Sequence, residues 1–253
     1  VTMAHGSGGR AMQQMIEQMF ISAFDNPWLN EREDGARLSL ASLSAQGDRL
    51  AFTTDSYVID PIFFPGGNIG KLAVCGTAND LAVCGATPAY LSCGFILEEG
   101  LALDDLQKIV SAMAQTAHAA GIAIVTGDTK VVQRGAADKI FINTAGIGVI
   151  PTAVNWAAGT IKAGDKVIVS GTLGDHGAAI LNLREKLGMD LGVESDCAVL
   201  APMIAPLRPL AGVHALRDAT RGGVNAILHE FSAASGFGIS IDEIALPVKP
   251  AVR

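Results

Sequence analysis

Three aspartates occupy settings that would suit a site for a magnesium nucleotide. Asp55, Asp80 and Asp128 each lie where an apolar stretch, typical of a strand or a helix, is followed by small or flexible residues. Carboxylates placed in this way can converge on one cation, and Mg²⁺ held by a few carboxylates takes its remaining ligands from water and substrate phosphates. With glycine-rich loops between and before them, the three aspartates predict an enzyme that uses ATP.

The glycine-rich loops match neither of the common nucleotide-binding motifs. Only three residues separate Gly66 from Gly70, and Leu72 stands where a P-loop needs Ser or Thr. The segment 171–177 lacks the glycine spacing of an NAD-binding fold. Gly8 and Gly9 stand just before the first predicted helix, where free amides and the helix N-terminus favour an anion. That loop either cradles phosphate or is a flexible arm with a helix cap.

Two of the aspartates have neighbours that strengthen the hypothesis of a site. Asp80 follows Asn79 inside a helix of small apolar residues, where an unpaired charge is costly and a metal or basic partner is the usual remedy. Gly127 and Asp128 are followed by Lys130, directly after a strand predicted at 122–125. The ends of strands are where α/β sheets bind ligands, although a surface turn with an ion pair would give the same pattern.

Composition excludes several classes of protein. The chain has 253 residues, a net charge of −7 and no dense run of Lys or Arg, which argues against a nucleic-acid surface. The longest uncharged stretch, 140–161, is long enough to cross a bilayer, but its glycines, proline and asparagines favour a buried strand and a linker. No signal peptide opens the sequence. The four cysteines have no metal-binding spacing, so we expect buried, reduced thiols in a cytoplasmic protein without a membrane span.

Hydrophobic periodicity predicts a layered α/β fold in two units. The expected first unit, residues 1–150, contains helices at 10–24, 69–84 and 103–120 and strands at 50–58 (interrupted at Asp55), 89–97, 122–125 and 139–150. A linker is expected at 151–164. The expected second unit, 165–253, contains strands at 166–170, 213–217 and 238–241 and helices at 177–187, 196–208 and 223–234. Because no final element is evident after residue 248, we expect this second α/β domain to be incomplete.

Taken together, the motifs resemble one superfamily. The segments 54–58, 66–82, 126–131 and 218–223 resemble the aminoimidazole ribonucleotide synthetase superfamily, which includes selenophosphate synthetase, thiamine-monophosphate kinase and the hydrogenase maturation proteins of the HypE family. The segments 4–10, 60–71, 174–177 and 246–248 resemble the HypE family in particular. The resemblance covers the whole chain.

The resemblance implies a two-domain protein whose mixed N-terminal sheet, with its helices, pairs across a homodimer, with ATP held near that interface. By matching motifs, it assigns magnesium and phosphate to Asp55, Asp80 and Asp128. Further nucleotide contacts would come from Asn79, Gly127 and Lys130, and the loop with Gly8 and Gly9 would close over the phosphates.

The implied reaction is an ATP-dependent dehydration of a carboxamide on the protein's own C-terminal cysteine. It yields a thiocyanate, whose cyano group is destined for the iron of [NiFe]-hydrogenase. Lys130 is the residue expected to stabilise or steer phosphoryl transfer, which depends mainly on charge neutralisation. The implied partners are the carbamoyltransferase HypF and the HypC–HypD complex.

The chain departs from the family pattern at its C-terminal end. No cysteine follows Cys197, and the family's acceptor tail is not in the sequence. We therefore expect this chain to bind ATP without completing the cyanation. Two alternatives stay open: another ATP-dependent small-molecule kinase or synthetase of the superfamily, and a non-catalytic scaffold in hydrogenase maturation. Selenophosphate synthetase is disfavoured because the first ten residues lack its reactive cysteine.

Overall fold

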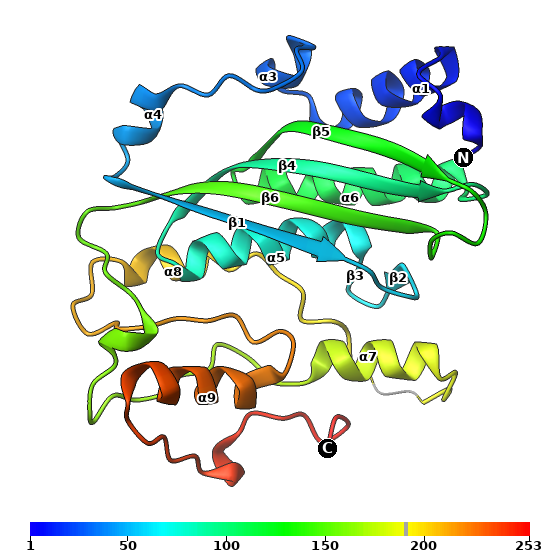
Figure 1. The fold of residues 1–253 in the computed structure, drawn as a ribbon. Coiled ribbons are helices and arrows are strands. Elements are labelled where there is room, and N and C mark those ends of the chain that lie inside the picture. Colours follow the sequence, from blue (N-terminus) through cyan, green and yellow to red (C-terminus); the bar gives the residue numbers. More distant parts are fainter. Residues whose placement is uncertain (190–191) are drawn as a thin grey trace.

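A four-stranded mixed sheet forms the centre of the molecule (Figure 1). The computed structural model describes residues 1–189 and 192–253. The strands lie in the order β1 (Arg49–Tyr57), β6 (Ile140–Ile150), β4 (Thr87–Glu98) and β5 (Ala123–Val132). β6 pairs antiparallel with both β1 and β4, whereas β4 and β5 are parallel. The mixed sheet confirms the predicted fold class of this part of the chain.

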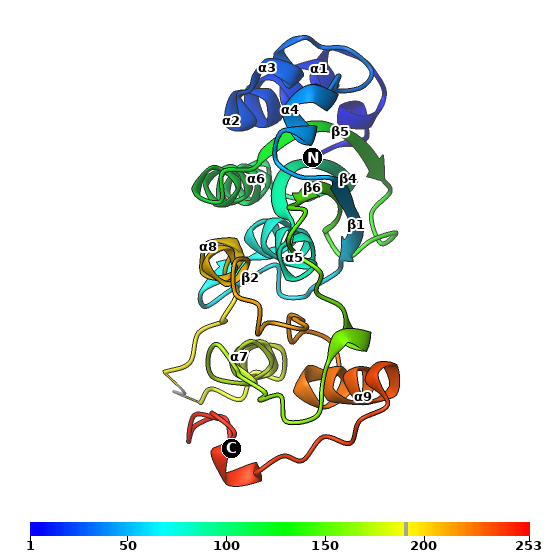
Figure 2. The ribbon, with the colours of Figure 1, turned by 90° about the vertical axis from the view of Figure 1, so that its left-hand side faces the viewer.

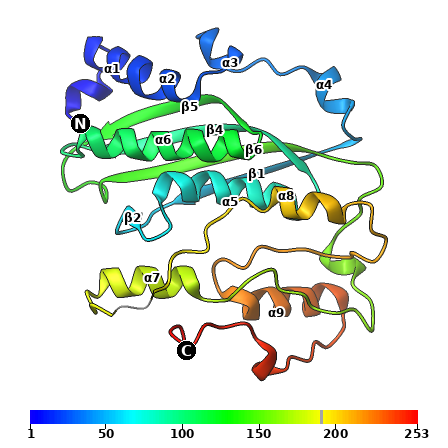
Figure 3. The same ribbon diagram turned by 180° about the vertical axis from the view of Figure 1, so that it is seen from behind.

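Two long helices cover one face of the sheet and leave the other face without a helix (Figures 2 and 3). α6 (Leu103–Ala119) buries its predicted stripe completely, including Ile109 and Met113. α5 (Ile69–Val83) follows the hairpin of β2 (Phe63–Phe64) and β3 (Gly67–Asn68). Asn68 caps α5 by accepting hydrogen bonds from the amides of Gly70 and Lys71. Both predicted helices are thereby confirmed.

The N-terminal helices pack along the β5 side of the sheet (Figure 1). α1 (Arg10–Met15), a π-helical segment (Ile16–Ile21) and α2 (Ser22–Phe24) are consecutive, which confirms the helix predicted at 10–24. A 3₁₀ turn (Met3–Gly6) precedes them, and α3 (Pro27–Asn30) and α4 (Leu40–Ser44) follow. The phenyl rings of Phe20 and Phe95 lie 4.8 Å apart, joining this layer to the core.

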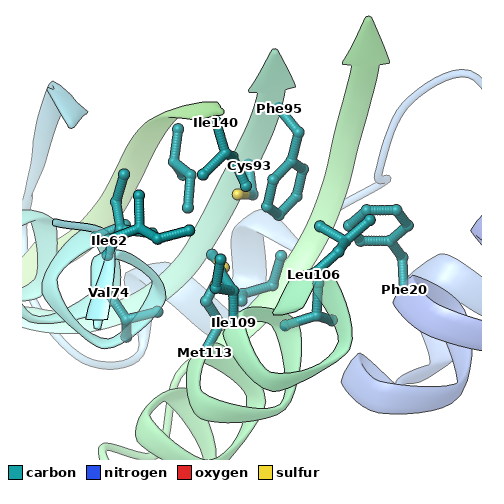
Figure 4. Close-up of a cluster of buried hydrophobic side chains, with 14 of the residues drawn as sticks. Phe20, Ile62, Val74, Cys93, Phe95, Leu106, Ile109, Met113 and Ile140 are labelled. Carbon is teal, nitrogen blue, oxygen red and sulfur yellow. The ribbon is translucent and has the colours of Figure 1, made fainter. Parts of the chain in front are cut away.

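The main hydrophobic core lies between the sheet and the helices α5 and α6 (Figure 4). Cys93 belongs to this core, and Cys75 on α5 is also buried; 1% and 2% of their surfaces are exposed, as predicted. Cys84 is exposed, so the prediction of a buried thiol there is wrong. It caps the C-terminus of α5 and extends beyond the packed part of that helix.

The close contact between α5 and α6 depends on Gly70, and a substitution there has a large expected effect. A Cβ at Gly70 would collide with the carbonyl oxygen of Ile109 and lie 2.7 Å from Cγ of Met113. We expect Gly70→Ala to lower the free energy of unfolding by about 2–3 kcal/mol, because neither helix can move away without opening the core. Gly177→Ala is the matched control, since that helical glycine has no atom within 4 Å of its would-be Cβ.

Urea unfolding of the two glycine variants measures this difference. Gly177→Ala should be neutral or stabilising by up to about 1 kcal/mol, as expected for an exposed helix position. Equal stability of the two variants would contradict the close helix contact.

The second half of the chain folds below α5 as helices joined by extended segments (Figure 1). Its helices are α7 (Asp175–Arg184), α8 (Ala201–Ile204) with a 3₁₀ turn (Ala205–Leu207), and α9 (Gly223–Ser235). Shorter 3₁₀ turns lie at Ala158–Thr160 and Glu243–Ala245. The helices predicted at 177–187 and 223–234 are confirmed, and the one at 196–208 is shorter than predicted.

The three strands predicted in this half are wrong for the described residues. Segments 166–170, 213–217 and 238–241 are extended or irregular and belong to no sheet. Backbone groups in a strand need a partner strand to bond, and none of the described residues pairs with these segments. Ile168, which a sheet would bury, is 89% exposed. Among the described helices, none has the length and apolar character needed to cross a membrane.

Candidate active site

Asp55 lies in the middle of β1 and faces α5. Its register partner on β6 is Thr144, which is fully buried and donates a hydrogen bond of 3.2 Å to the carbonyl oxygen of Ala73 on α5. The hydroxyl of Tyr57 donates to Asp55 Oδ2 over 3.2 Å and lies 3.3 Å from the hydroxyl of Thr77 on α5. β1 is continuous, so the predicted interruption at Asp55 is wrong. The carboxylate is accommodated because Tyr57, two residues further along β1, donates a hydrogen bond to it.

Asp80 meets the same surface from α5. Its Oδ2 accepts a hydrogen bond of 2.9 Å from the hydroxyl of Thr53, two residues before Asp55 on β1. Burial, together with the nearby negative charges of Asp218 and Asp55, raises the pKa of Asp80 to about 6. The structure thus brings Asp55 and Asp80 together, and their carboxylates repel each other.

Asp218 joins this carboxylate pair, and the sequence prediction did not include it. Burial and the charge of Asp55 raise the pKa of Asp218, while the neighbouring guanidinium of Arg217 opposes the shift. Asp218 lies on the segment before α9, more than a hundred residues from β1 and α5. The motif 218–223 was the available signal, because it belongs to the set that resembles the superfamily, but its glycines alone indicated only a helix start.

Asp128 and Lys130 lie on the opposite face of the sheet. β5 continues to Val132, so the prediction that they follow the strand is wrong. Asp128 pairs in register with Gly94, whereas the adjacent Cys93 and Phe95 of β4 are buried beneath the helices. Asp128 and Lys130 are two-thirds exposed and form an ion pair of 2.7 Å, and the ammonium group of Lys130 lowers the pKa of Asp128.

A single chain therefore does not bring the three predicted aspartates together. Asp55 and Asp80 lie beneath the sheet, against α5, and Asp128 lies on the uncovered face. Among the described residues, no three Asp, Glu, His or Cys side chains are grouped closely enough to hold a metal ion. A metal at Asp55 and Asp80 would need further oxygen ligands from elsewhere.

The predicted glycines occupy two different settings. Gly127 packs against β4, where a Cβ would collide with the carbonyl oxygen of Cys93. Gly8 has φ of +77°, a conformation that favours glycine, and its would-be Cβ has open space around it. Gly9 is the N-cap of α1. The loop at Gly8 and Gly9 is thus exposed and unobstructed, whereas Gly127 has a packing role.

Asn79 connects the two halves of the chain. Its Nδ2 donates to the carbonyl oxygen of Ala198 over 2.9 Å, and its Oδ1 accepts from the amide of Leu200 over 2.8 Å. The side chain is buried, with 8% of the residue exposed. Both ends of the amide are therefore engaged by the backbone segment that leads into α8. Its predicted contact with a nucleotide stays a prediction.

Removing this amide should loosen the second half of the chain. We expect Asn79→Ala to cost about 2–3 kcal/mol, because it leaves the carbonyl of Ala198 and the amide of Leu200 without partners. Hydrogen exchange read by mass spectrometry should show faster exchange at 198–200. Asn30→Ala, at an exposed amide that bonds only Asp25, is the control. Unchanged protection at 198–200 would exclude the connecting role.

Comparisons with known proteins identify the family of the chain. Residues 32–150 match the family model described as "AIR synthase related protein, N-terminal domain", and residues 162–252 match the corresponding C-terminal domain. The carbamoyl dehydratase HypE of Escherichia coli strain K12 is 70% identical over all 253 residues, which span 75% of that protein.

Two solved structures of HypE proteins are also similar to this chain. One, in complex with ATP, is 47% identical with a TM-score of 0.92, covering 99% of this chain and 73% of that one. The other, a HypE–HypF complex, is 48% identical with a TM-score of 0.79, covering 94% and 76%. The chain belongs to the HypE family of carbamoyl dehydratases, the hydrogenase maturation proteins among the AIR synthase related proteins.

Proposed function

We propose that this carbamoyl dehydratase binds ATP with Mg²⁺ where β1, α5 and the segment before α9 meet. The observation that carries the proposal is the convergence of Asp80 on α5 with Asp55 on β1 and Asp218 before α9. Burial and the charges of Asp218 and Asp55 raise the pKa of Asp80 to about 6. A protein gains nothing in stability from crowding half-buried carboxylates, so a cation that binds there accounts for the cluster. The ATP complex of the relative supports the choice of nucleotide.

The residues present fit magnesium. Asp55 and Asp80 offer oxygen donors only, which is the ligand set of a hard cation, and two carboxylates leave positions for phosphate oxygens and water. When bound, the metal would neutralise the phosphates and the charge that develops during phosphoryl transfer. Thr53 and Tyr57 hold the carboxylates of Asp80 and Asp55 by hydrogen bonds of 2.9 and 3.2 Å, which restrict the movement of both groups.

We also propose that the uncovered face of the sheet is the surface of a homodimer. Its exposed apolar side chains lie on two strands: Leu50 and Phe52 on β1 and Ile96 on β4, at 55%, 71% and 42% exposure. No helix of the described chain covers this face (Figure 2). A second copy that packs its own uncovered face here would bury them, and two-fold symmetric dimers are the commonest oligomers.

In such a dimer, Asp128 and Lys130 would act on the partner's nucleotide. They lie on the same uncovered face as Phe52 and away from Asp55 and Asp80 of their own chain. We propose that they supply the missing contacts across the interface. Lys130 would then neutralise charge on the transferred phosphoryl group, and the exposed loop with Gly8 and Gly9 would close over the phosphates.

The chemistry of the dehydration fits such a site. The carboxamide oxygen attacks the γ-phosphorus of ATP, and ADP leaves. The carbon–oxygen bond then breaks and both protons leave the nitrogen. The products are a thiocyanate on the cysteine sulfur and free phosphate. The chain's residues are needed to orient ATP and to neutralise negative charge, since phosphoryl transfer is catalysed mainly by positioning and electrostatics.

The proposed assembly follows the family. The relative's complex supports HypF as a partner, and we propose the HypC–HypD complex as the acceptor of the cyano group. We place the dimer surface and most of the nucleotide site in residues 1–150. Residues 165–253 are assigned to a second domain, which is joined by 151–164 and contributes Asp218 to the site. A cytoplasmic location is proposed because four free cysteines suit a reducing compartment and ATP is abundant there.

A mixing experiment tests the proposed site across the interface. Asp80→Asn and Asp128→Asn should each lose the binding of magnesium ATP measured by calorimetry. After subunit exchange, each hybrid dimer would carry one intact site, so about a quarter of all sites should recover in an equal mixture. Recovery would support Asp128 acting on the partner's nucleotide. No recovery, in a mixture whose hybrids are verified by native mass spectrometry, would overturn that placement.

A further inference from the structure

A cavity of about 540 Å³, which none of the clustered carboxylates lines, lies between α5, α6 and the segment that leads into α8. Two cysteines, Cys75 and Cys197, line it together with Lys71. The rest of its wall consists of uncharged residues, from α6 (Ala112, Gln115, Thr116, Ala119), from the segment before α8 (Ala198, Val199) and from α8 itself (Pro202). The dehydration described above uses neither of these cysteines, and nothing in the function of the carboxylate site requires a thiol pair.

The two thiols belong to different halves of the chain, line the same cavity and influence each other's ionisation. Cys75 is on α5 and is 2% exposed, whereas Cys197 is partly exposed. The backbone around Cys197 is fixed on both sides. The amide of Ser195 donates to the carbonyl of Pro65 over 2.9 Å, and the carbonyl of Ala198 is held by Asn79. The position of Cys197 on the wall of the cavity is therefore part of the packed structure.

The charges around the pair favour a thiolate at Cys197. The hydrogen bond from the Cys75 thiol lowers the pKa of Cys197, and the ammonium group of Lys71 lowers it further, against burial and the charge of Asp196. The same hydrogen bond and burial raise the pKa of Cys75. Lys71 is held in place by a hydrogen bond of 2.7 Å to the carbonyl of Gly66. Cys197 is thus the thiol that ionises more readily, and Cys75 is the thiol that keeps its proton.

We propose that Cys197 is the reactive thiol of this chain and that it forms an oxidisable pair with Cys75 inside this cavity. The thiolate is the nucleophilic form of cysteine, and a low-pKa thiol next to a second thiol is the arrangement of redox-sensitive sites. The cavity opens the pair to small reagents such as a peroxide. The bond formed would join α5 to the segment before α8.

The chemistry balances with hydrogen peroxide as the oxidant. The Cys197 thiolate attacks one peroxide oxygen, the O–O bond breaks, and Cys197 becomes a sulfenic acid with release of hydroxide. The Cys75 sulfur then attacks the Cys197 sulfur, the S–O bond breaks, and water leaves as the disulfide forms. The two sulfurs lose two electrons in total, which the peroxide accepts.

Competitive alkylation tests the assignment of the reactive thiol. The native chain would be treated with less than one equivalent of iodoacetamide at pH 7, and each cysteine peptide would be quantified by mass spectrometry. Cys84 is the internal control because it is exposed, and burial and the charge of Asp80 raise its pKa. We expect Cys197 to react several-fold faster than Cys84. Faster reaction at Cys84 would show that solvent exposure of the thiol determines the rate of alkylation, and it would overturn the proposal.

Peroxide treatment tests the pair. The native chain should give a peptide linked between Cys75 and Cys197. Cys75→Ala should give no linked peptide and should instead leave a sulfenic acid at Cys197 that dimedone captures. Lys71→Met should keep the pair but slow alkylation of Cys197 by about threefold or more. Dimedone capture at Cys84 in place of Cys197, or a native chain that forms no linked peptide, would contradict the proposed pair.

Discussion

The substitution Asp80→Asn should strongly weaken binding of magnesium ATP while leaving the ligand-free protein as stable as before or more stable. The charge of Asp80 is a cost to the folded chain, because burial and the carboxylates of Asp218 and Asp55 raise its pKa to about 6. The new amide keeps an oxygen that can accept the hydrogen bond from Thr53. What is lost is a negative oxygen for the metal, and we expect affinity for magnesium ATP to fall by about 10–100-fold.

The pH dependence of this effect follows from the direction of the pKa shift. Protonated Asp80 contributes stability that is complete below pH 3.8 and is lost as the pH rises through about 6. Above pH 6 the unsubstituted chain therefore carries the full cost of the buried charge. Removing it should raise stability by about 1 kcal/mol, once screening by solvent at this half-buried site is allowed for.

Thermal unfolding with and without magnesium ATP measures both the stability of the ligand-free chain and its binding of the nucleotide. Asp80→Asn should unfold at the same or a higher temperature without ligand, and ligand should no longer shift that temperature. Asp138→Asn, at an exposed acid outside the cluster, should behave as the unsubstituted chain. A variant that loses stability and keeps the ligand-induced shift would show that Asp80 has a structural role instead.

The substitution Phe52→Glu should convert the proposed dimer to monomers. Phe52 is 71% exposed in the single chain, in the apolar patch on the uncovered face of the sheet. A dimer that uses this face would bury the ring, and an aromatic side chain at the centre of an interface commonly contributes more than 2 kcal/mol. Placing a carboxylate there would add the cost of burying an unpaired charge, so the dissociation constant should rise by at least about 100-fold.

The matched control is Leu40→Glu. Leu40 on α4 is 72% exposed, almost the same as Phe52, but it does not belong to the sheet. Sedimentation equilibrium should show a dimer for the unsubstituted chain and for Leu40→Glu, and a monomer for Phe52→Glu. A monomeric unsubstituted chain, or a Phe52→Glu variant that stays dimeric, would contradict the assignment of the uncovered face.

Sequence patterns predicted the first half of the fold well because its elements have local signatures. The apolar stripe of α6 and the small residues of α5 each identify a helix without knowledge of its neighbours. The predictions failed where local chemistry and tertiary context disagree. The segment Gly127-Asp128-Thr129 has the composition of a turn, yet it lies inside β5 because β4 pairs with it along its length.

The second half shows why apolar segments alone do not predict strands. Segment 166–170 has the composition of a buried strand, but a strand exists only where another strand bonds to it, and the described residues provide none. The sequence could not reveal this because pairing depends on residues far away in the chain.

The candidate site was predicted in part. Asp55 and Asp80 were expected to converge, and the structure brings them together through Thr53 and Tyr57. Asp128 lies on the other face because of its register in β5, next to β4. The sequence prediction ended this strand before Asp128, so it could not assign Asp128 to a face of the sheet. Asp218 was missed because its proximity to Asp80 is a long-range contact with no local pattern.

Calorimetric titration of the unsubstituted chain with ATP tests the central claim, that the carboxylates of β1 and α5 hold ATP through magnesium. At pH 7.5 with Mg²⁺ we expect one ATP bound per chain, and a loss of affinity of about tenfold or more when a chelator removes the metal. Because burial raises the pKa of Asp80 to about 6, protonation at pH 5.5 should weaken binding by a further factor of about four. Binding of equal strength with and without Mg²⁺ at both pH values would contradict the account, and so would the absence of binding.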